Sequence, residues 1–386
     1  MTDKIIRGSG GPPPTPPSPT RAPDTLNSRQ FATIQDLLSE GEIEGFATPS
    51  KAELTKGSTA YNNAAQKDIF LNGTPILQSS ASNTNPGASD FNFQNVVFTP
   101  RFGTGNQNHI PGIQQSQTPL AGFGGVLCSK SNNGVTRALP TGKDAVRITI
   151  TFAQIQRATD KGDLLGSTVE VKVSLRKNNE VDFTELFTDT ITGRTADAYS
   201  KDYRVELPDG YTSADIKIER VTDDRAPGGN IVDAFSVSAL QLLIDDKQRY
   251  LNSAYTNLRI DSEQFSSIPK RAFRIRGVKV RIPGAGASSS GTPTVDLQTG
   301  RIIYPSGYIF NGTMVAAQWC SCPSMVLLDL LTTERYGFGT HITDSNLDLF
   351  SFVAASRYAN ELVSDGFGGQ EARFSCNVNL QGSMEA

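Results

Sequence analysis

The sequence predicts a mainly β protein with a small α+β part near its C-terminal end. Apolar residues alternate strictly with polar ones in several stretches after Asp144, which is the period of a half-buried strand. The 386 residues include 35 glycines and 21 prolines, an excess that is typical of many turns. Apolar residues recur at helical spacing only near the end of the chain. A chain of this length is expected to form two or three domains.

The N-terminal segment is rich in proline. Seven prolines lie between residues 12 and 23, a density that prevents helix and ladder formation and favours extended polyproline II. We therefore expect residues 1–25 to form an N-terminal arm. Composition alone favours a plain tail, and the alternative is a strap laid over a neighbouring subunit.

The first structured segment is expected to begin near Leu26. Phe31, Ile34 and Leu38 have a spacing that permits a short helix, but Gly41 follows closely and a strand competes. Asn72 and Gly73 separate two apolar runs and predict a hairpin with a two-residue type I′ turn.

A β-sandwich is predicted for the middle of the chain. Residues 79–142 are loop-rich and are expected at a surface or interface. Strands are predicted at 146–152, 169–175, 216–220 and 235–244. Residues 85–252 are therefore expected to form one β-rich module.

A basic strand is predicted after this module. Residues 270–281 contain six basic and no acidic residues, so the remaining 30 basic and 39 acidic residues give the rest of the chain a net charge of −9. The phase of the alternation shifts at Gly277, which suggests a bulge. The basic side can face an acidic partner, a nucleic acid or solvent. We favour an acidic partner, because arginine grips carboxylates with two parallel hydrogen bonds. The predicted interface residues are Arg271, Arg274, Arg276, Lys279 and Arg281.

Two helices are predicted near the C-terminus. The first spans about Ser324–Arg335, and the second runs from Leu347 to Leu362 with Asp344 as its N-cap. The glycine-rich run at 365–369 is interpreted as a helix cap that leads into a strand. Together these elements form a helical layer.

No catalytic, cofactor-binding or metal-binding residue is predicted, and the chain is not expected to be an enzyme. The four cysteines are too few for a disulfide framework, and Cys320 and Cys322 are one residue closer than the C-x2-C spacing of a zinc site. The sequence contains two histidines and has no G-x-S-x-G, H-E-x-x-H or Walker motif. It has no run of eighteen apolar residues and no signal-peptide pattern, so synthesis in a reducing cytoplasm is expected.

Six segments together resemble the host-specificity (tip attachment) protein J family of lambda-like siphophage tails, and they occur in that family's order. The segments are LNSRQFATIQDLLSEGEIEG (26–45), IFLNGTPIL (69–77), DSEQFSSIPKRAFRIRGVKVRIP (261–283), FNGTM (310–314), LLDLLTTERYGFG (327–339) and DGFGGQEARFSCNVNL (365–380).

The resemblance implies a homotrimeric hub at the distal end of a long phage tail. It implies β-barrel-like hub domains in which residues 26–84 and 253–320 form one hub domain, 85–252 are an inserted β-sandwich, and 321–386 begin the next α+β hub domain. Such a hub caps the tail tube, carries the host-attachment apparatus and opens for DNA ejection. The residues expected to shape the joint after the helices are Tyr336, Gly337, Asp365, Gly366, Phe367, Gly368 and Gly369.

The resemblance also implies partners and a location. The partners are other tail-tip and tail-tube proteins, with the tape measure protein or DNA in the lumen. Members of the family are much longer than this chain, so contact with the host receptor is expected through parts not in this chain. These parts belong either to a longer protein or to a second polypeptide. The protein would be made in the host cytoplasm and placed in the virion.

Two alternatives remain open on sequence alone. A glycan-binding or glycan-depolymerising β protein would need an aromatic platform, or two carboxylates about 5–9.5 Å apart. A DNA-contacting portal or clamp would need the basic strand to line a lumen.

Overall fold

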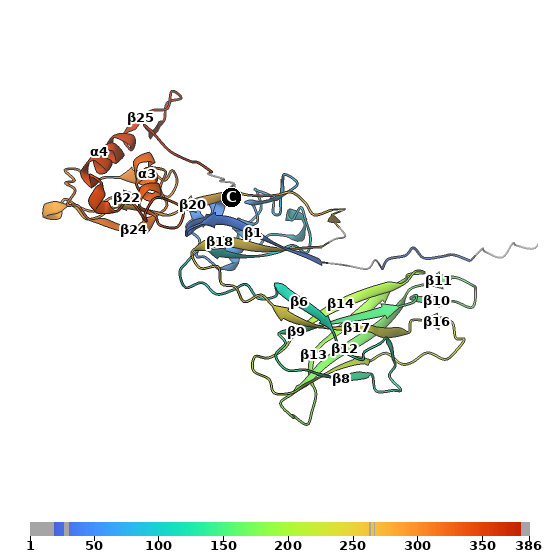
Figure 1. Cartoon of the computed structure of the whole chain (residues 1–386). Coiled ribbons are helices and arrows are strands. Elements are labelled where there is room, and N and C mark those ends of the chain that lie inside the picture. The colour runs from blue at the N-terminus through green and yellow to red at the C-terminus, as the bar shows by residue number, and fades with distance from the viewer. Residues whose placement is uncertain (1–18, 27–30, 262–263, 266, 380–386) are drawn as a thin grey trace, which may run out of the picture. The chain divides into compact units, whose positions relative to one another are not determined.

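The computed structural model describes residues 19–26, 31–261, 264–265 and 267–379. The chain divides into two compact units. Among the described residues, 19–26 and 112–246 form one unit, which we call the insert unit. The described residues of 31–111 and 247–379 form the other, which we call the split unit because the insert interrupts its sequence. Figure 1 shows the insert in green to yellow, whereas the split unit is blue and orange to red.

The insert unit is an antiparallel two-sheet sandwich. One sheet has the strand order β13-β12-β15-β8, and the other has the order β14-β9-β17-β6, with β7 also paired to β17. A small third sheet has the order β11-β10-β16. The strands are β6 (Gln114–Pro119), β7 (Val126–Cys128), β8 (Val135–Leu139), β9 (Ala145–Phe152), β10 (Gln156–Ala158), β11 (Leu164–Leu165), β12 (Ser167–Lys177), β13 (Thr184–Gly193), β14 (Tyr199–Glu206), β15 (Ala214–Arg220), β16 (Ile231–Val232) and β17 (Phe235–Asp245).

Strict alternation explains why these strands form a sandwich. In β9 the inward residues from Val146 to Phe152 are fully buried, and Val171 and Val173 of β12 face the same core. Phe152 and Phe235 pack with their ring centroids 5.1 Å apart. Each fully buried apolar side chain of this size stabilises the fold by about 1.5–3 kcal/mol. The four strands predicted for this region are confirmed as β9, β12, β15 and β17.

The split unit begins with a strand. Of the two interpretations of residues 31–38, the short helix is therefore wrong and the strand is confirmed. β1 (Phe31–Glu40) pairs antiparallel with β18 (Ser253–Asp261), and β18 also pairs with β5 (Val97–Phe102). Ile34 is half-buried on the inner side of β1, whereas Leu37 is 63% exposed. Pairing with a distant strand therefore overrides the local helical spacing.

The hairpin predicted at Asn72-Gly73 is confirmed. Strands β3 (Ile69–Leu71) and β4 (Thr74–Pro75) pair antiparallel, and both turn residues have positive φ, 51° and 86°, as a type I′ turn requires. Ile69 and Leu71 are fully buried beside Tyr61 of α2 (Thr59–Ala65).

The basic segment is not one strand. It forms β19 (Arg271–Phe273), β20 (Ile275–Val278) and β21 (Val280–Pro283), which pair with β3, β2 (Ile43–Phe46) and β24 (Met314–Gln318) respectively. The bulge expected at Gly277 is absent from the β2–β20 register, and the chain instead changes sheet at Arg274 and Lys279. The alternation continues because each short strand buries one face against a different neighbour.

The C-terminal part contains two longer helices, α3 (Pro323–Thr332) and α4 (Leu349–Ala359), which pack against each other. The first ends earlier than predicted, because Thr333 adopts extended dihedral angles. Asp348, not Asp344, is the N-cap of α4: its side chain accepts a hydrogen bond from the Phe350 N–H, whereas Asp344 begins a 3₁₀ turn. Leu362 lies outside α4, in β25 (Leu362–Ser364).

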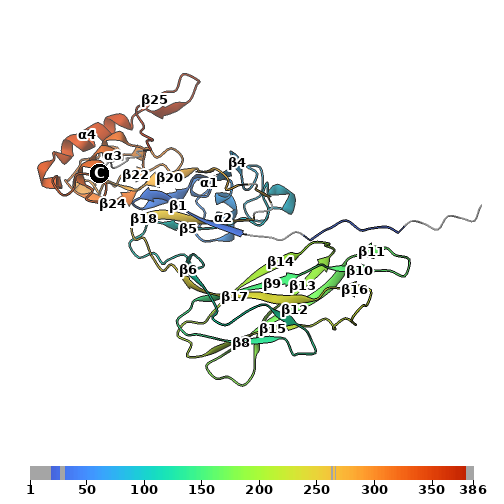
Figure 2. The same ribbon diagram turned by 45° about the vertical axis from the view of Figure 1, so that its right-hand side comes forward.

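The glycine-rich run at 365–369 is a hairpin loop, not a helix cap. It joins β25 to β26 (Gln370–Ala372), and this hairpin extends from the helices in two views (Figures 1 and 2). The remaining elements are α1 (Ala47–Lys51), β22 (Thr294–Val295), β23 (Ile302–Ile303) and the 3₁₀ turns Ala88–Asp90, Ala287–Ser289 and Asp344–Asn346.

The fold is therefore mainly β with a small helical part, as predicted. Within the described ranges no sheet closes into a barrel, and the sheets of the split unit are open sheets of two or three strands. In the same residues no helix has the length and apolar character needed to cross a membrane.

Candidate interaction surface on the basic segment

The predicted interface residues lie in the split unit, and most of them bind acids of the same chain. Arg271 grips Asp36 with two hydrogen bonds, Nε to Oδ2 at 2.7 Å and Nη2 to Oδ1 at 2.9 Å. Both side chains are about one-fifth exposed, at 23% and 19%. This bidentate pair joins β19 to β1, which precedes the insert in the sequence.

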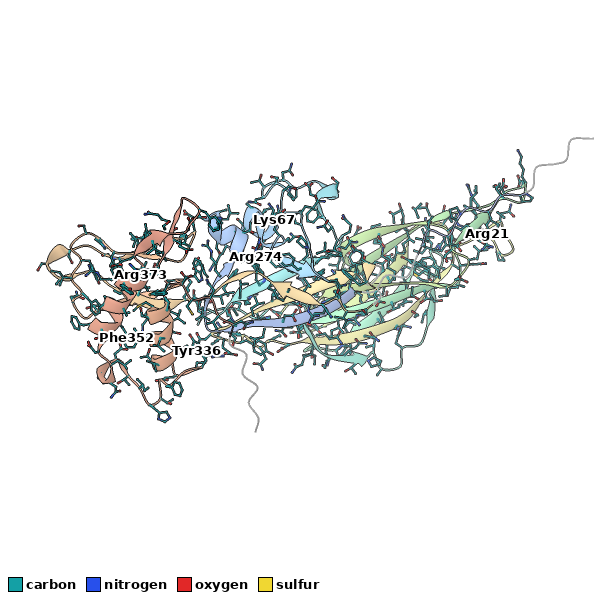
Figure 3. All side chains as sticks on the ribbon, turned by 90° about the horizontal axis from the view of Figure 1, so that it is seen from above. Arg21, Lys67, Arg274, Tyr336, Phe352 and Arg373 are labelled. Carbon is teal, nitrogen blue, oxygen red and sulfur yellow. The ribbon has the colours of Figure 1, made fainter. Side chains whose placement is uncertain are left out.

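Arg274 binds the most deeply buried acid of this surface. Its Nη2 lies 2.6 Å from Oδ1 of Asp68, whose side chain is 0% exposed. Asp68 also accepts hydrogen bonds from the Thr48 backbone N–H (2.5 Å) and hydroxyl (2.8 Å). Arg274 itself is 58% exposed, and Figure 3 places it near Lys67, the neighbour of Asp68. Asp68 therefore connects the start of α1, the β3 hairpin and the basic segment.

Lys279 and Arg281 complete this series of ion pairs. Lys279 lies 2.7 Å from Glu42 and 3.7 Å from Glu44. Arg281 binds both carboxylate oxygens of Asp344 at 2.8 Å, and these hydrogen bonds lower the pKa of that carboxyl. The basic segment thus joins residues before the insert to the C-terminal helical part.

Arg276 is the exception among the five. Its guanidinium lies over the Trp319 ring, 4.4 Å from the ring centroid, and the residue is only 5% exposed. Its Nη1 is buried without a hydrogen-bond partner in the described part of the chain. Burial lowers the pKa of Arg276. The other four residues bind acids of the same chain, so Arg276 is the one of the five without a carboxylate partner among the described residues. A role of these five residues in an interface with another protein stays a prediction.

The residues predicted to shape a joint lie in two separate places. The Tyr336 hydroxyl donates to Asp329 of α3 at 2.7 Å, and Gly337 follows in a turn where a Cβ atom would lie 2.2 Å from the Leu330 carbonyl oxygen. Gly337 is thus required by close packing against α3.

The second group forms the loop of the β25–β26 hairpin. The Asp365 carboxylate accepts hydrogen bonds from the N–H groups of Phe367 (2.8 Å) and Gly369 (2.9 Å). Gly366 and Gly368 have φ of 80° and 92°, and Phe367 is 96% exposed. Tyr336 and Gly337 thus belong to the turn after α3, and residues 365–369 form the loop between β25 and β26. That these residues together form a joint after the helices stays a prediction.

The cysteines beside α3 are core residues. Cys320 and Cys322 are buried, and burial raises the pKa of the Cys320 thiol to about 12. The Cys322 Sγ lies 3.1 Å from the Ser356 hydroxyl oxygen. No group of three or more His, Cys, Asp or Glu side chains suited to a metal ion is found among residues that the structure describes.

Sequence reasoning missed the docking of the arm. Residues 1–18 of the expected arm lie outside the described residues, but residues 19–26 pack on the insert unit. The Thr20 N–H donates to Asp163 at 2.6 Å, and the Ala22 N–H donates to the Leu164 carbonyl at 2.9 Å. Asp24 forms an ion pair with Arg194, which is 2% exposed. The described part of the arm is therefore a strap on its own chain.

The insert unit also contains a buried charge cluster that was not predicted. Asp233 forms ion pairs with Arg220 at 2.6 Å and Arg225 at 3.0 Å. One signal was available: Arg220 continues the inward-facing series of Ile216 and Ile218 in β15, so the alternation places a cation in the core.

These features define a mainly β protein that has an antiparallel sandwich inserted into a second unit. Residues 125–246, within the sandwich, match the family described as the FNIII-A domain of tip attachment protein J. Over 381 residues the chain is 29% identical to the tip attachment protein J of Escherichia phage SECphi4, covering 98% of this chain and 30% of the relative. Over 393 residues it is 25% identical to the protein of the same name from Escherichia phage SECphi27, covering 100% of this chain and 29% of the relative. The resemblance to the tip attachment protein J family is confirmed.

The chain spans less than one-third of the length of these relatives, 30% and 29%. Among solved structures, a chain of the lipid-containing bacteriophage PM2 is 13% identical over 62% of this chain and 74% of that chain. The TM-score between the two chains is 0.20.

Proposed function

We propose that the chain is a structural component of the tail tip of a long-tailed bacteriophage, at the distal end of the tail. Similarity to two proteins named tip attachment protein J along 98% and 100% of the chain carries this proposal. The match of residues 125–246 to a domain of that protein supports it. In this role the chain forms a homotrimeric hub that caps the tail tube, carries the host-attachment apparatus and opens for DNA ejection.

In this proposal the basic segment has a structural role, since four of its five predicted interface residues stabilise the chain's own fold through carboxylates. The partners of such a hub are other tail-tip and tail-tube proteins, with the tape measure protein or DNA in its lumen. The host receptor is reached through parts outside this chain.

Cryo-electron microscopy of purified virions tests the proposal, with masses of the tail-tip polypeptides measured in the same preparation. Three copies around the tail axis below the tube are expected. A peripheral position, or absence from the particles, would refute the hub. Release of reducing ends from host polysaccharide would then support a glycan-active protein.

A further inference from the structure

The insert unit holds an extended segment at the edge of its small sheet. Residues 19–26, which we call the strap, lie beside β11, the outer strand of the order β11-β10-β16. The Leu164 N–H donates to the Thr20 carbonyl at 2.9 Å, and the Ala22 N–H donates to the Leu164 carbonyl at 2.9 Å. The strap is therefore added to this sheet by backbone pairing, which is one of the ways in which proteins bind extended peptides.

Arg194 makes the side-chain contact with the strap. It is 2% exposed, and its Nη1 donates to the Ala22 carbonyl at 2.8 Å and to the Asp24 carboxylate. Its Nε and Nη2 are buried without a hydrogen-bond partner within the described ranges, where Asp24 is its one acidic partner. Because a buried guanidinium needs a hydrogen-bonded counter-charge, this site favours a segment that carries a carboxylate at the position of Asp24.

The strap lies on the surface of the insert unit. Six of its eight residues are exposed, and Ala22 and Leu26 are half-buried. Leu26 packs against the sandwich core, and a Cβ atom at Gly193 would lie 2.7 Å from the Leu26 Cγ, so the site is shaped for this side chain. Segments with few buried apolar contacts open locally at a lower free energy than the core strands beside them. The strap can therefore leave its site while the sandwich stays folded.

The strap binds at the end of the insert unit opposite its other connections to the split unit. Those connections lie at residues 111–112 and 246–247, next to the start of β6 and the end of β17. Thr195, which follows Arg194, forms a bridge with Ile155 beyond the far end of β9, and the eight residues of β9 span about 24 Å. Within the insert unit, Figures 1 and 2 show β10 and β11 at the end away from β6. The strap is thus a further attachment of the insert, because the chain continues from residue 26 to β1.

We propose that this end of the insert unit is a binding site for an extended peptide with one carboxylate, and that the strap occupies it reversibly. Backbone pairing with Leu164 supplies affinity, and Arg194 supplies selectivity for the acid. When the strap leaves, the far end of the insert is free to move about the two remaining connections. These lie close together, since the Asp246 N–H donates to the Ile113 carbonyl at 2.7 Å.

A synthetic peptide with the sequence of residues 19–26, PTRAPDTL, tests the site on the full chain. The peptide carries a fluorescent label, and its anisotropy is measured as wild type or Asp24→Asn chain is added. In the Asp24→Asn chain the strap has lost its carboxylate. A second peptide has Asn in place of Asp. Asp223→Asn is the matched control variant, because it removes an exposed ion pair of the insert, with Lys130, that involves no strap residue.

The acidic peptide should bind the Asp24→Asn chain saturably and at least about tenfold more tightly than it binds wild type or Asp223→Asn. In those two chains the intact strap competes at an effective concentration of about 1 mM. The Asn peptide should bind at least about tenfold more weakly than the acidic one, because it leaves Arg194 without a counter-charge. Small-angle X-ray scattering should differ between wild type and Asp24→Asn, because release of the strap frees the far end of the insert.

Circular dichroism melting curves show whether each variant is folded. If Asp24→Asn does not fold, Ala22→Pro takes its place, since it removes the N–H that pairs with Leu164 and keeps the carboxylate. The binding site is overturned if the peptide does not bind the folded variant, if both peptides bind equally, or if wild type binds the peptide as tightly as the variant. Identical scattering curves overturn the release of the insert. None of these results bears on the tail-tip function, which is tested by the position of the chain in virions.

Discussion

Replacing Asp233 with Asn should destabilise the insert unit by several kcal/mol. The Asp233 side chain is 0% exposed and accepts hydrogen bonds from Arg220, Arg225 and Ser167 at 2.6, 3.0 and 2.9 Å. Removing one partner of a buried ion pair costs about 3–5 kcal/mol, because the remaining charge is left uncompensated. Arg220 keeps a bond to the backbone carbonyl of residue 233 at 2.7 Å, so we expect about 3 kcal/mol. For a unit of this size that lowers the melting temperature by about 10 °C.

The pH dependence gives this prediction a second readout. Burial alone would raise the pKa of Asp233, but the hydrogen bonds from Arg225, Ser167 and Arg220 lower it overall. A depressed pKa in the folded state stabilises the fold above the unfolded pKa of about 3.9, and this contribution is lost as the pH falls through the folded pKa. The difference between wild type and Asp233→Asn should therefore be full at neutral pH and shrink below about pH 4.

Calorimetry and far-ultraviolet circular dichroism measure the transition of the insert unit. Trp319 lies in the split unit and reports separately on that unit. Arg225→Met is the matched control: its side chain is 29% exposed, so its loss should cost only about 1 kcal/mol. If Asp233→Asn lowers the free energy of unfolding by less than about 1 kcal/mol, or if both variants lower it equally, the buried charge cluster does not stabilise the insert unit as argued.

Five further substitutions test other parts of the fold. Asp68→Ala removes the acceptor of the Thr48 N–H and hydroxyl as well as the Arg274 pair, so it should cost about 3 kcal/mol. Arg274→Met leaves the buried Asp68 carboxylate without its cation but with both Thr48 hydrogen bonds, so it should cost about 2 kcal/mol. Urea unfolding followed by Trp319 fluorescence measures both, and equal values would show that the ion pair, not the buried acceptor, is the stabilising element. Gly337→Ala should cost at least about 2 kcal/mol, because the new Cβ would lie 2.2 Å from a backbone oxygen. Gly368→Ala meets no atom within 4 Å and should cost about 1 kcal/mol from its φ of 92° alone. Melting temperatures compare the two, and the reverse order would contradict the packing argument. Asp24→Asn should lower the melting temperature of the insert unit, because Arg194 is 2% exposed and loses its counter-charge. An unchanged calorimetric transition would mean that residues 19–26 do not stabilise this unit.

The strands of the insert were predictable because one physical rule decides them. Each strand of a sandwich has one buried face, so the sequence alternates with period two and burial follows it, as from Val146 to Phe152. The same rule misled the interpretation of residues 271–283, where alternation continues through three strands that belong to different sheets. Periodicity reports burial of a face and does not report which neighbour covers it.

The partners of the basic residues were not predictable for a related reason. Asp36, Asp68 and Asp344 are separated from Arg271, Arg274 and Arg281 by 235, 206 and 63 residues. Their approach depends on the tertiary pairing of β1, β3 and β21 with distant segments, which no local pattern encodes. Charge alone suggested an external partner, and the structure places the partners of these three arginines within the chain.

The split unit also has a consequence for the order of folding. β1 pairs with β18, so its partner is synthesised more than 200 residues later, a delay of about 10–40 s at 5–20 residues per second. The insert has all its strands between residues 114 and 245 and can fold first. When it does, the backbone N–H of Asp246 bonds to the Ile113 carbonyl at 2.7 Å, which brings together positions 133 residues apart. Closing a flexible loop of that length would cost about 4 kcal/mol in chain entropy. If the insert folds first, this entropy has already been lost when β18 leaves the ribosome. Pairing of β18 with β1 then closes only the short segments on either side of the insert.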